Sequence, residues 1–276
     1  MDLHCHLLPG VDDGPGSLDQ TVAYAAAAGT TTIVATPHVE LVDVAELPDR
    51  VQEVRDALRD AGVPLHVEVG GELKPQSIGD LDDADLEVIA HGPPGARWLL
   101  YEVPFEGVDG GGGPGFIAGA QELRDRGYGL LLAHPERSRG ILPAGIEQLG
   151  PELLAGAVIA ANVGPLNERV TPERHAASLE ILRRGMVGVI ATDAHAPRRP
   201  WTLAEGRSAV LQATGDAVLA EGLTAANPAS LLRDGIAIRT RARRVSDPAG
   251  AELRSRLHEP IQHRGSGSLR RSASVR

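Results

Sequence analysis

The first residues of the chain that could do chemistry are two histidines on either side of a cysteine, His4 and His6 around Cys5. In a β-strand, residues two apart point to the same face, so the two imidazoles would lie together and the thiol would point away from them. Two neighbouring imidazoles can bind one divalent cation. A thiolate nucleophile for phosphate would need an arginine at the end of the short loop that follows it, and residues 6–11 contain none. We therefore interpret the pattern as metal-binding and Cys5 as a buried, unreactive side chain.

Further metal-binding residue types recur where predicted strands end. The segments rich in apolar and β-branched residues that we predict to be buried strands are 30–38, 65–72, 98–103, 128–134, 157–163 and 186–195. The ligand-type residues at or just after the strand ends are His4, His6, Asp13, His38, Glu72, Glu102, His134, Asp193 and His195. Asp12 is adjacent to Asp13 in the loop that follows the first strand, and it is the alternative to Asp13 at this position.

Helices are predicted between these strands. Ser17 and Thr171 are of the residue types that begin helices, and residues 48–61, 114–126 and 202–214 have helical composition and spacing. Repeated strand–helix units predict an α/β fold with a parallel sheet, and about seven such units favour a TIM-like barrel. In a barrel the carboxyl ends of the strands converge, so the nine residues would meet in one pocket. Five imidazoles and four carboxylates are expected together there only if cations neutralise them, which predicts a metal site.

Composition divides the chain into two parts. Residues 1–240 carry the strand–helix pattern and are predicted to form the barrel domain, with a core of Ala, Val, Leu and Ile because aromatic residues are only 3%. Residues 241–276 are rich in arginine and serine and show no periodicity, so we predict a disordered C-terminal tail.

Charge and composition also exclude several classes of function. The net charge of -10 disfavours a nucleic-acid partner. A single cysteine excludes an internal disulfide. No run of about 18 apolar residues is present, so no stable membrane insertion is expected. The start of the chain also lacks a basic, apolar leader, and we expect a cytoplasmic protein.

The charge of the predicted site indicates a substrate. Four carboxylates and neutral imidazoles with three divalent cations would carry about +2, which suits a phosphate monoester, whereas two cations would leave a net charge near zero. A cluster of ions can activate a water and hold both the attacking and the leaving oxygen, which is the chemistry of phosphoester hydrolysis. Nitrogen and carboxylate ligands without thiolate suit Mn, Fe or Zn.

Eight short motifs in order give the chain a resemblance to a known superfamily. They are HCH, VDDGPGS, TPH, GGEL, YEVP, AHPER, NVGPL and TDAH. Together they resemble the PHP (polymerase and histidinol phosphatase) superfamily, and VDDGPGS with AHPER resembles the CpsB/CapC family of manganese-dependent bacterial protein-tyrosine phosphatases of capsule synthesis. The likeness covers roughly residues 1–235. It implies a distorted (β/α)7 barrel, three divalent metal ions, and phosphotyrosine in proteins as the substrate, with a bacterial tyrosine kinase of polysaccharide synthesis as a candidate partner.

The resemblance also implies roles for individual residues. His4, His6, Glu72 and Asp193 would hold one metal ion, with Glu72 bridging to a second ion that Glu102 and His134 hold, while Asp13, His38 and His195 would hold the third. Arg137 would bind phosphate, and a second phosphate-binding arginine is expected after TDAH, where Arg199 is our first choice and Arg198 the second. Asn162 ends a predicted strand and would either touch the substrate or cap a turn.

Three other functions fit parts of the pattern. A histidinol-phosphate phosphatase or another small-molecule phosphoesterase would share the metal ligands and differ in the loops around the pocket. An amidohydrolase would bridge its metal ions with a carboxylated lysine, and we find no lysine at a strand end that could serve. A non-catalytic metal-binding module would be expected to have lost some ligands, and none is missing here.

Overall fold

The described part of the chain contains parallel strands in two sheets. The computed structural model describes residues 1–105, 115–139, 146–167, 170–239 and 252. One sheet has the order β1-β2-β3 and the other β4-β5-β6-β7-β8. The strands are β1 (Asp2–Cys5), β2 (Thr32–Ala35), β3 (His66–Val69), β4 (Glu72–Leu73), β5 (Trp98–Glu102), β6 (Gly129–Ala133), β7 (Val158–Asn162) and β8 (Val187–Ala191). All predicted strands are present, and the predicted parallel α/β architecture is confirmed.

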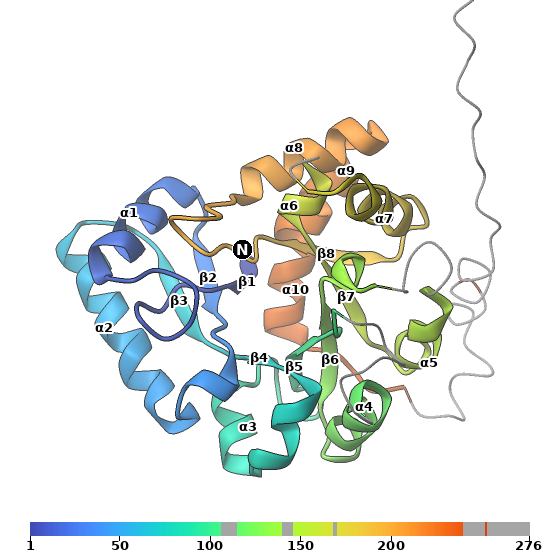
Figure 1. Cartoon of the computed structure of the whole chain (residues 1–276), viewed down its shortest axis with the longest axis horizontal. Coiled ribbons are helices and arrows are strands. Elements are labelled where there is room, and N and C mark those ends of the chain that lie inside the picture. The colour runs from blue at the N-terminus through green and yellow to red at the C-terminus, as the bar shows by residue number, and fades with distance from the viewer. Residues whose placement is uncertain (106–114, 140–145, 168–169, 240–251, 253–276) are drawn as a thin grey trace, which may run out of the picture.

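Two parallel bridges connect the two sheets, as the strand order of a barrel requires. Cys5 of β1 bridges to Ala194, which follows β8, and His38, which follows β2, bridges to Glu72 of β4. Figure 1 shows the strands around a common centre, with most of the helices on the outside and one helix across the middle of the view. These bridges lie at the carboxyl ends of the strands, which are therefore held together at the end where the predicted ligands lie.

A pair of glycines divides the predicted strand 65–72 into β3 and β4. A Cβ atom at Gly70 would lie 2.5 Å from Cγ1 of Val34, and one at Gly71 would lie 2.6 Å from Cγ1 of Val39. Larger residues would therefore push this segment away from β2. The close approach keeps β3 paired with β2, and Glu72, directly after the two glycines, pairs with Leu100 of the other sheet.

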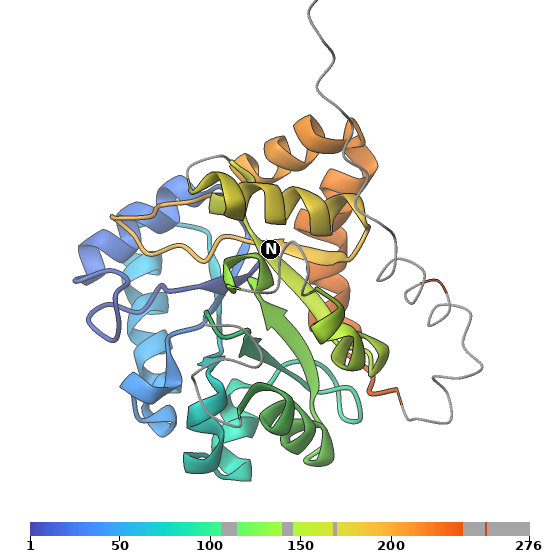
Figure 2. The ribbon, with the colours of Figure 1, turned by 45° about the vertical axis from the view of Figure 1, so that its right-hand side comes forward.

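The helices are α1 (Leu18–Ala28), α2 (Leu47–Asp60), α3 (Asp83–Ile89), α4 (Gly115–Asp125), α5 (Gly150–Leu154), α6 (Val163–Leu166), α7 (Pro172–Arg183), α8 (Leu203–Thr214), α9 (Ala217–Glu221) and α10 (Asn227–Asp234). Short 3-10 turns are η1 (Val39–Leu41), η2 (Val44–Glu46), η3 (Pro75–Asp80), η4 (Pro135–Arg137) and η5 (Ile146–Leu149), and η6 (Gly222–Ala226) is a π turn. Ser17 and Thr202 accept backbone hydrogen bonds at the starts of α1 and α8, as helix N-caps do. Figure 2 shows α7 and α8 running over one side of the strands.

Helix α10 and the segment after it close the end of the barrel where the strands begin. Trp98 at the start of β5 donates from Nε1 to the carbonyl of Leu231 over 2.9 Å, and the amide of Ile236 donates to the carbonyl of Ala96 over 2.9 Å. Ile236 packs in the inner core with side chains such as Leu3 and Leu131. The opposite end, at the carboxyl ends of the strands, is left for the predicted site.

Membrane-spanning helices and the C-terminal tail were the two remaining features considered from the sequence. No helix among the described residues is both long and apolar enough to cross a bilayer. The predicted disordered tail, residues 241–276, lies outside the described residues except for Glu252, so that prediction stands as a prediction.

Candidate metal centre

Glu72 lies at the centre of the predicted ligand set. Its Oε2 atom is 3.2 Å from Nδ1 of His38, 3.3 Å from Nε2 of His6 and 3.4 Å from Nε2 of His4. Its Oε1 atom is 2.9 Å from Nε2 of His134. The side chain is 1% exposed, and although burial alone would raise the pKa of Glu72, the surrounding imidazoles hold that pKa well below its usual range. One carboxylate thus faces imidazoles from three different strand ends.

Asp193 forms a second carboxylate centre on the other side of the same histidines. Its Oδ1 atom is 3.5 Å from Nε2 of His4 and 3.4 Å from Nε2 of His6. Its Oδ2 atom accepts hydrogen bonds from Nη1 of Arg137 over 2.6 Å and from Nδ2 of Asn162 over 2.8 Å. Burial would raise the pKa of Asp193, but His4, His6 and Arg137 outweigh it and hold the pKa well below its usual range.

The backbone turns sharply at two of the predicted ligands. His134 has φ 38° and Asp193 has φ 47°, and among the described residues these are the non-glycine positions with positive φ. Non-glycine residues rarely adopt this left-handed conformation, and such residues cluster at functional sites. Here the turn comes directly after β6 and shortly after β8, where the chain leaves the barrel and the side chain is directed into the cluster.

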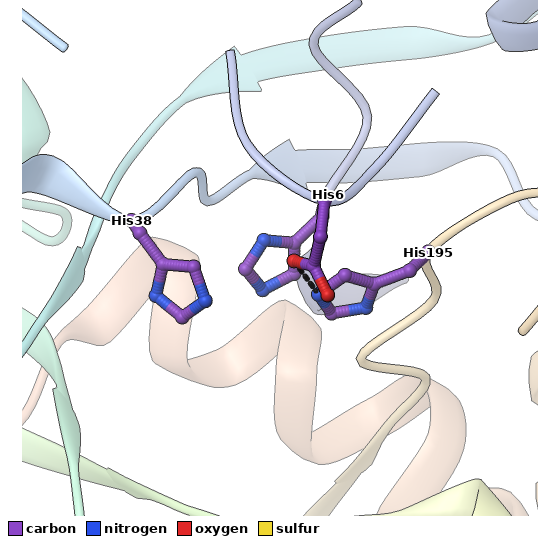
Figure 3. Close-up of side chains that lie close together, drawn as sticks. His6, His38 and His195 are labelled. Atoms are coloured by element: carbon purple, nitrogen blue, oxygen red, sulfur yellow. Dashed lines mark ion pairs between the residues drawn. The ribbon is translucent and has the colours of Figure 1, made fainter. Parts of the chain in front are cut away.

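A third group lies where β1, β2 and β8 end. The rings of His6 and His195 stack with centroids 3.8 Å apart, and those of His6 and His38 are 4.7 Å apart. Figure 3 shows these three rings close together, although they come from three separate segments. Nε2 of His195 is 2.9 Å from Oδ1 of Asp13, and Nη2 of Arg199 is 3.5 Å from Oδ2 of the same aspartate.

Glu102 completes the cluster at the end of β5. Burial, followed by the charge of Glu72, raises the pKa of Glu102 to about 8. Burial and the charge of Arg137 lower the pKa of His134 to about 4.

The ligand atoms fall into groups of a size suited to metal ions. Four groups have all their ligand atoms within 4.8 Å of one another: His6, Asp13, His38 and His195; His4, His6 and Glu72; His4, His134 and Asp193; and Glu72, Glu102 and His134. These groups contain all nine predicted ligands. Oδ1 of Asp193 is buried, faces imidazole nitrogens and has no hydrogen-bond partner among the described residues, so divalent cations fit this cluster.

The other predicted site residues lie around the same cluster. Arg137 and Asn162 contact Asp193 as described, and Asn162 does not cap α6 through its side chain. The side chain of Arg199 is 38% exposed and reaches Asp13, whereas Arg198 is exposed. The amide and carbonyl groups of His195 and Arg199 pair with each other, which turns Arg199 back toward the site.

Three buried carboxylates next to the ligands were not predicted. Asp12 contacts Nδ1 of His6 over 2.6 Å and accepts from the amide of His38, and its hydrogen bond with His6 outweighs burial and lowers its pKa to about 2. Glu136 accepts from the amide of Asn162, and burial raises its pKa to about 7. Asp2 accepts from the hydroxyl of Thr192. Asp2 shares the strand face of His4 and His6, and this period of two was the one sequence signal for it.

Outside the cluster, two expectations about reactive residues were tested by the structure. Cys5 is fully buried, its Sγ lies 3.9 Å from the hydroxyl of Tyr24 in α1, and burial raises the pKa of its thiol well above the usual value, as expected for an unreactive cysteine. The sequence predicted no lysine at a strand end that could bridge metal ions, and Lys74, which directly follows β4, does not take that position. Its ammonium group pairs with Glu40, and Glu72 occupies the position between the imidazoles.

Several known proteins are similar to this chain in sequence and in fold. Residues 1–233 match the family described as "Capsular polysaccharide synthesis, CpsB/CapC". The chain is 30% identical over 207 residues, 71% of its length and 77% of the relative's, to tyrosine-protein phosphatase YwqE of Bacillus subtilis. It is 27% identical over 213 residues, 74% of its length and 80% of the relative's, to the putative tyrosine-protein phosphatase CapC of Staphylococcus aureus. A solved structure from work on YwqE of B. subtilis and CpsB of Streptococcus pneumoniae, described as metal-dependent tyrosine phosphatases, superposes with a TM-score of 0.68 at 25% identity, covering 87% of this chain and 99% of the other.

Proposed function

The chain belongs to the CpsB/CapC family, and from this premise we propose that it is a metal-dependent phosphatase that hydrolyses phosphotyrosine in proteins. The observation that carries the proposal is the single cluster of nine imidazole and carboxylate side chains around Glu72 and Asp193. This chain covers more than two thirds of the length of each relative named as a tyrosine phosphatase. The family match spans all nine predicted metal ligands.

We assign three divalent metal ions to the cluster, with manganese as the preferred metal. His4, His6, Glu72 and Asp193 would hold one ion, Glu72, Glu102 and His134 a second, and Asp13, His38 and His195 a third. When bound, such ions would lower the pKa of a coordinated water and neutralise the charge of the phosphate. The carboxylates nearby orient the imidazoles, because Asp12 contacts Nδ1 of His6 and leaves its Nε2 facing Glu72 and Asp193.

Two arginines on opposite sides of the cluster would bind the phosphate. Arg137 lies against Asp193, and Arg199 lies against Asp13, so their guanidinium groups flank the imidazoles. A guanidinium group offers several N–H donors in one plane, so each arginine can keep its carboxylate and still donate to a phosphate oxygen. Asn162 would hold Asp193 and, through its buried Oδ1, which has no partner among the described residues, meet a donor on the substrate side. Arg198 is exposed and would contact the substrate only at the outer edge of the site.

The biological setting follows from the family and is part of the proposal. The matched family is described by capsular polysaccharide synthesis, so the substrate would be a phosphotyrosine protein of that process, for example a bacterial tyrosine kinase of polysaccharide synthesis. We place the enzyme in the cytoplasm, where such a kinase domain would carry its phosphotyrosine.

The test compares substrates on one preparation of the manganese-loaded protein. We expect kcat/KM for a phosphotyrosine peptide to exceed that for histidinol phosphate by at least about tenfold, a difference of about 1.4 kcal/mol in transition-state binding. A preference for histidinol phosphate would assign the chain to small-molecule phosphate esters. Hydrolysis of an amide or cyclic amide with no phosphatase activity would instead support an amidohydrolase, and metal binding with no hydrolysis of either kind would indicate a non-catalytic module.

A further inference from the structure

A phenylalanine and two arginines lie together just outside the metal cluster. Cζ of Arg139 is 4.8 Å from the centre of the Phe105 ring, and Cζ of Arg174 is 4.9 Å from the same centre. Both distances are within the range of a cation–π interaction. We refer to Phe105, Arg139 and Arg174 as the arginine–phenylalanine stack.

The stack is built from three neighbouring loops at the active end of the barrel. Phe105 comes three residues after Glu102 at the end of β5, and Arg139 comes two residues after Arg137 in the loop that follows β6. The amide of Arg139 donates to the carbonyl of Phe105 over 2.7 Å, which ties these two loops together. Arg174 lies in the first turn of α7, after β7. The stack is therefore continuous with the loops that carry two of the predicted ligands.

The positive charge of the stack is not balanced by any ion pair within the part of the chain that the structure describes. Among the described residues neither Arg139 nor Arg174 has a carboxylate partner, in contrast to Arg137 and Arg199. Burial and the charges of Arg137 and Arg139 lower the pKa of Arg174, so the three guanidinium groups are close enough to repel one another. With no carboxylate partner in the described part of the chain, these two guanidinium groups are available to bind an anion of a ligand.

We propose that the arginine–phenylalanine stack is a second anion-binding subsite, which takes an acidic side chain next to the phosphotyrosine of a peptide substrate. The inference rests on the proposed phosphatase function and adds the sequence preference of that enzyme. Cation–π contact covers the flat face of a guanidinium group and leaves its edge, with the N–H donors, for a carboxylate. The stack thereby favours acidic peptides over phosphate esters that have no flanking charge.

The test uses two phosphotyrosine peptides that differ only in having glutamate or glutamine beside the phosphotyrosine. For the wild-type protein we expect kcat/KM to be roughly 5- to 30-fold higher for the glutamate peptide, since two partly exposed guanidinium groups contribute modestly each. The ratio should fall below about twofold in the Arg139→Gln, Arg174→Gln double variant. Arg207→Gln is the matched control, because Arg207 is exposed on α8 and pairs with Glu221, and it should keep the wild-type ratio.

The salt dependence of the preference provides a second test of the subsite. In the wild-type protein the preference should shrink as salt rises from about 25 to about 300 mM, because exposed charge pairs are screened, and this holds even if the double variant fails to fold. A wild-type ratio near one, or a double variant that keeps the wild-type ratio, would overturn the subsite.

Hydrolysis of a small aryl phosphate tests the proposed phosphatase function separately from the subsite. A small aryl phosphate carries no flanking charge, so if the manganese-loaded wild-type protein does not hydrolyse it, the phosphatase assignment is wrong. The subsite is then judged by binding of the two fluorescently labelled peptides. Equal dissociation constants for them, or a preference that survives in the double variant, would reject the subsite as well.

Discussion

Arg137 and Asn162 donate hydrogen bonds to the same oxygen of Asp193, Oδ2, over 2.6 and 2.8 Å. The other oxygen, Oδ1, is buried without a hydrogen-bond partner among the described residues and faces His4 and His6. Asp193 is thus held by one oxygen and presents the other to the predicted metal cluster. Because two donors share the first oxygen, removal of one of them leaves the carboxylate in place.

This arrangement predicts the behaviour of Arg137→Ala. The variant should lose a charge-assisted contact to phosphate, which costs about 1.5–3 kcal/mol and lowers kcat/KM roughly 10- to 150-fold. Bound metal per chain should stay at the wild-type value, because Asn162 still holds Asp193. Steady-state kinetics and elemental analysis of the same sample provide the test, with Arg207→Ala as the control. Kinetics within twofold of wild type would show that Arg137 does not bind the phosphate.

Cys5→Ser separates the metal mechanism from a thiol mechanism. Cys5 is buried beside Tyr24 and points away from the imidazoles, so kcat should remain near the wild-type value. Burying a hydroxyl in place of the thiol should lower the free energy of unfolding by about 1 kcal/mol, as seen in denaturant unfolding. The metal-loaded wild type should also resist thiol alkylation. A hundredfold lower kcat in folded, metal-replete Cys5→Ser would mean that the thiol takes part in the reaction.

His91 is expected to make the protein less stable in mild acid. It packs against Trp98 with ring centroids 4.9 Å apart, and burial lowers its pKa from 6.5 to about 4. Above pH 6.5 the ring is neutral in both folded and unfolded chains, so it does not make the free energy of unfolding depend on pH. Between pH 6.5 and 4 the unfolded chain takes up a proton that the folded chain does not, so stability falls with pH, by about 1–2 kcal/mol at pH 5.

The measurement is the free energy of unfolding at about pH 7 and pH 5 for wild type, His91→Gln and His66→Gln. His91→Gln should show a smaller loss of stability between the two values, whatever its absolute stability. His66 is exposed beside Glu68, and its variant is the control for the loss of a histidine as such. An unchanged loss in His91→Gln would place the acid sensitivity elsewhere.

Deletion of the chain from about Val245 onward should leave turnover of a small aryl phosphate unchanged. All nine predicted ligands and both arginines proposed to bind phosphate precede this point, and the amide of Arg239 donates to the carbonyl of Ala155 at the end of the barrel away from the cluster. The assay compares kcat of the truncated and complete chains at equal metal content. A truncated chain that does not fold would show that the removed residues pack against the barrel.

Much of the metal cluster could be predicted because its members obey a simple geometric rule. Glu72, Glu102 and His134 each end or follow a strand whose apolar run is visible in the sequence, and the ends of parallel strands converge. The contacts between Arg137 and Asp193, or between Asp12 and His38, leave no such pattern, since they join residues far apart in the chain through tertiary packing. The break between β3 and β4 was missed for a related reason. Two glycines inside an apolar run signal a close approach, but not which neighbour approaches.

The central claim is that the cluster around Glu72 and Asp193 binds divalent ions that hydrolysis requires. The most direct measurement is the rate of phosphate release from a phosphotyrosine peptide by one sample, assayed after chelation and again after manganese is returned. We expect the chelated protein to lose at least about 99% of its activity and manganese to restore it, because without cations the cluster has no means of activating water. Full activity in a chelated sample shown by elemental analysis to contain no metal would contradict the account.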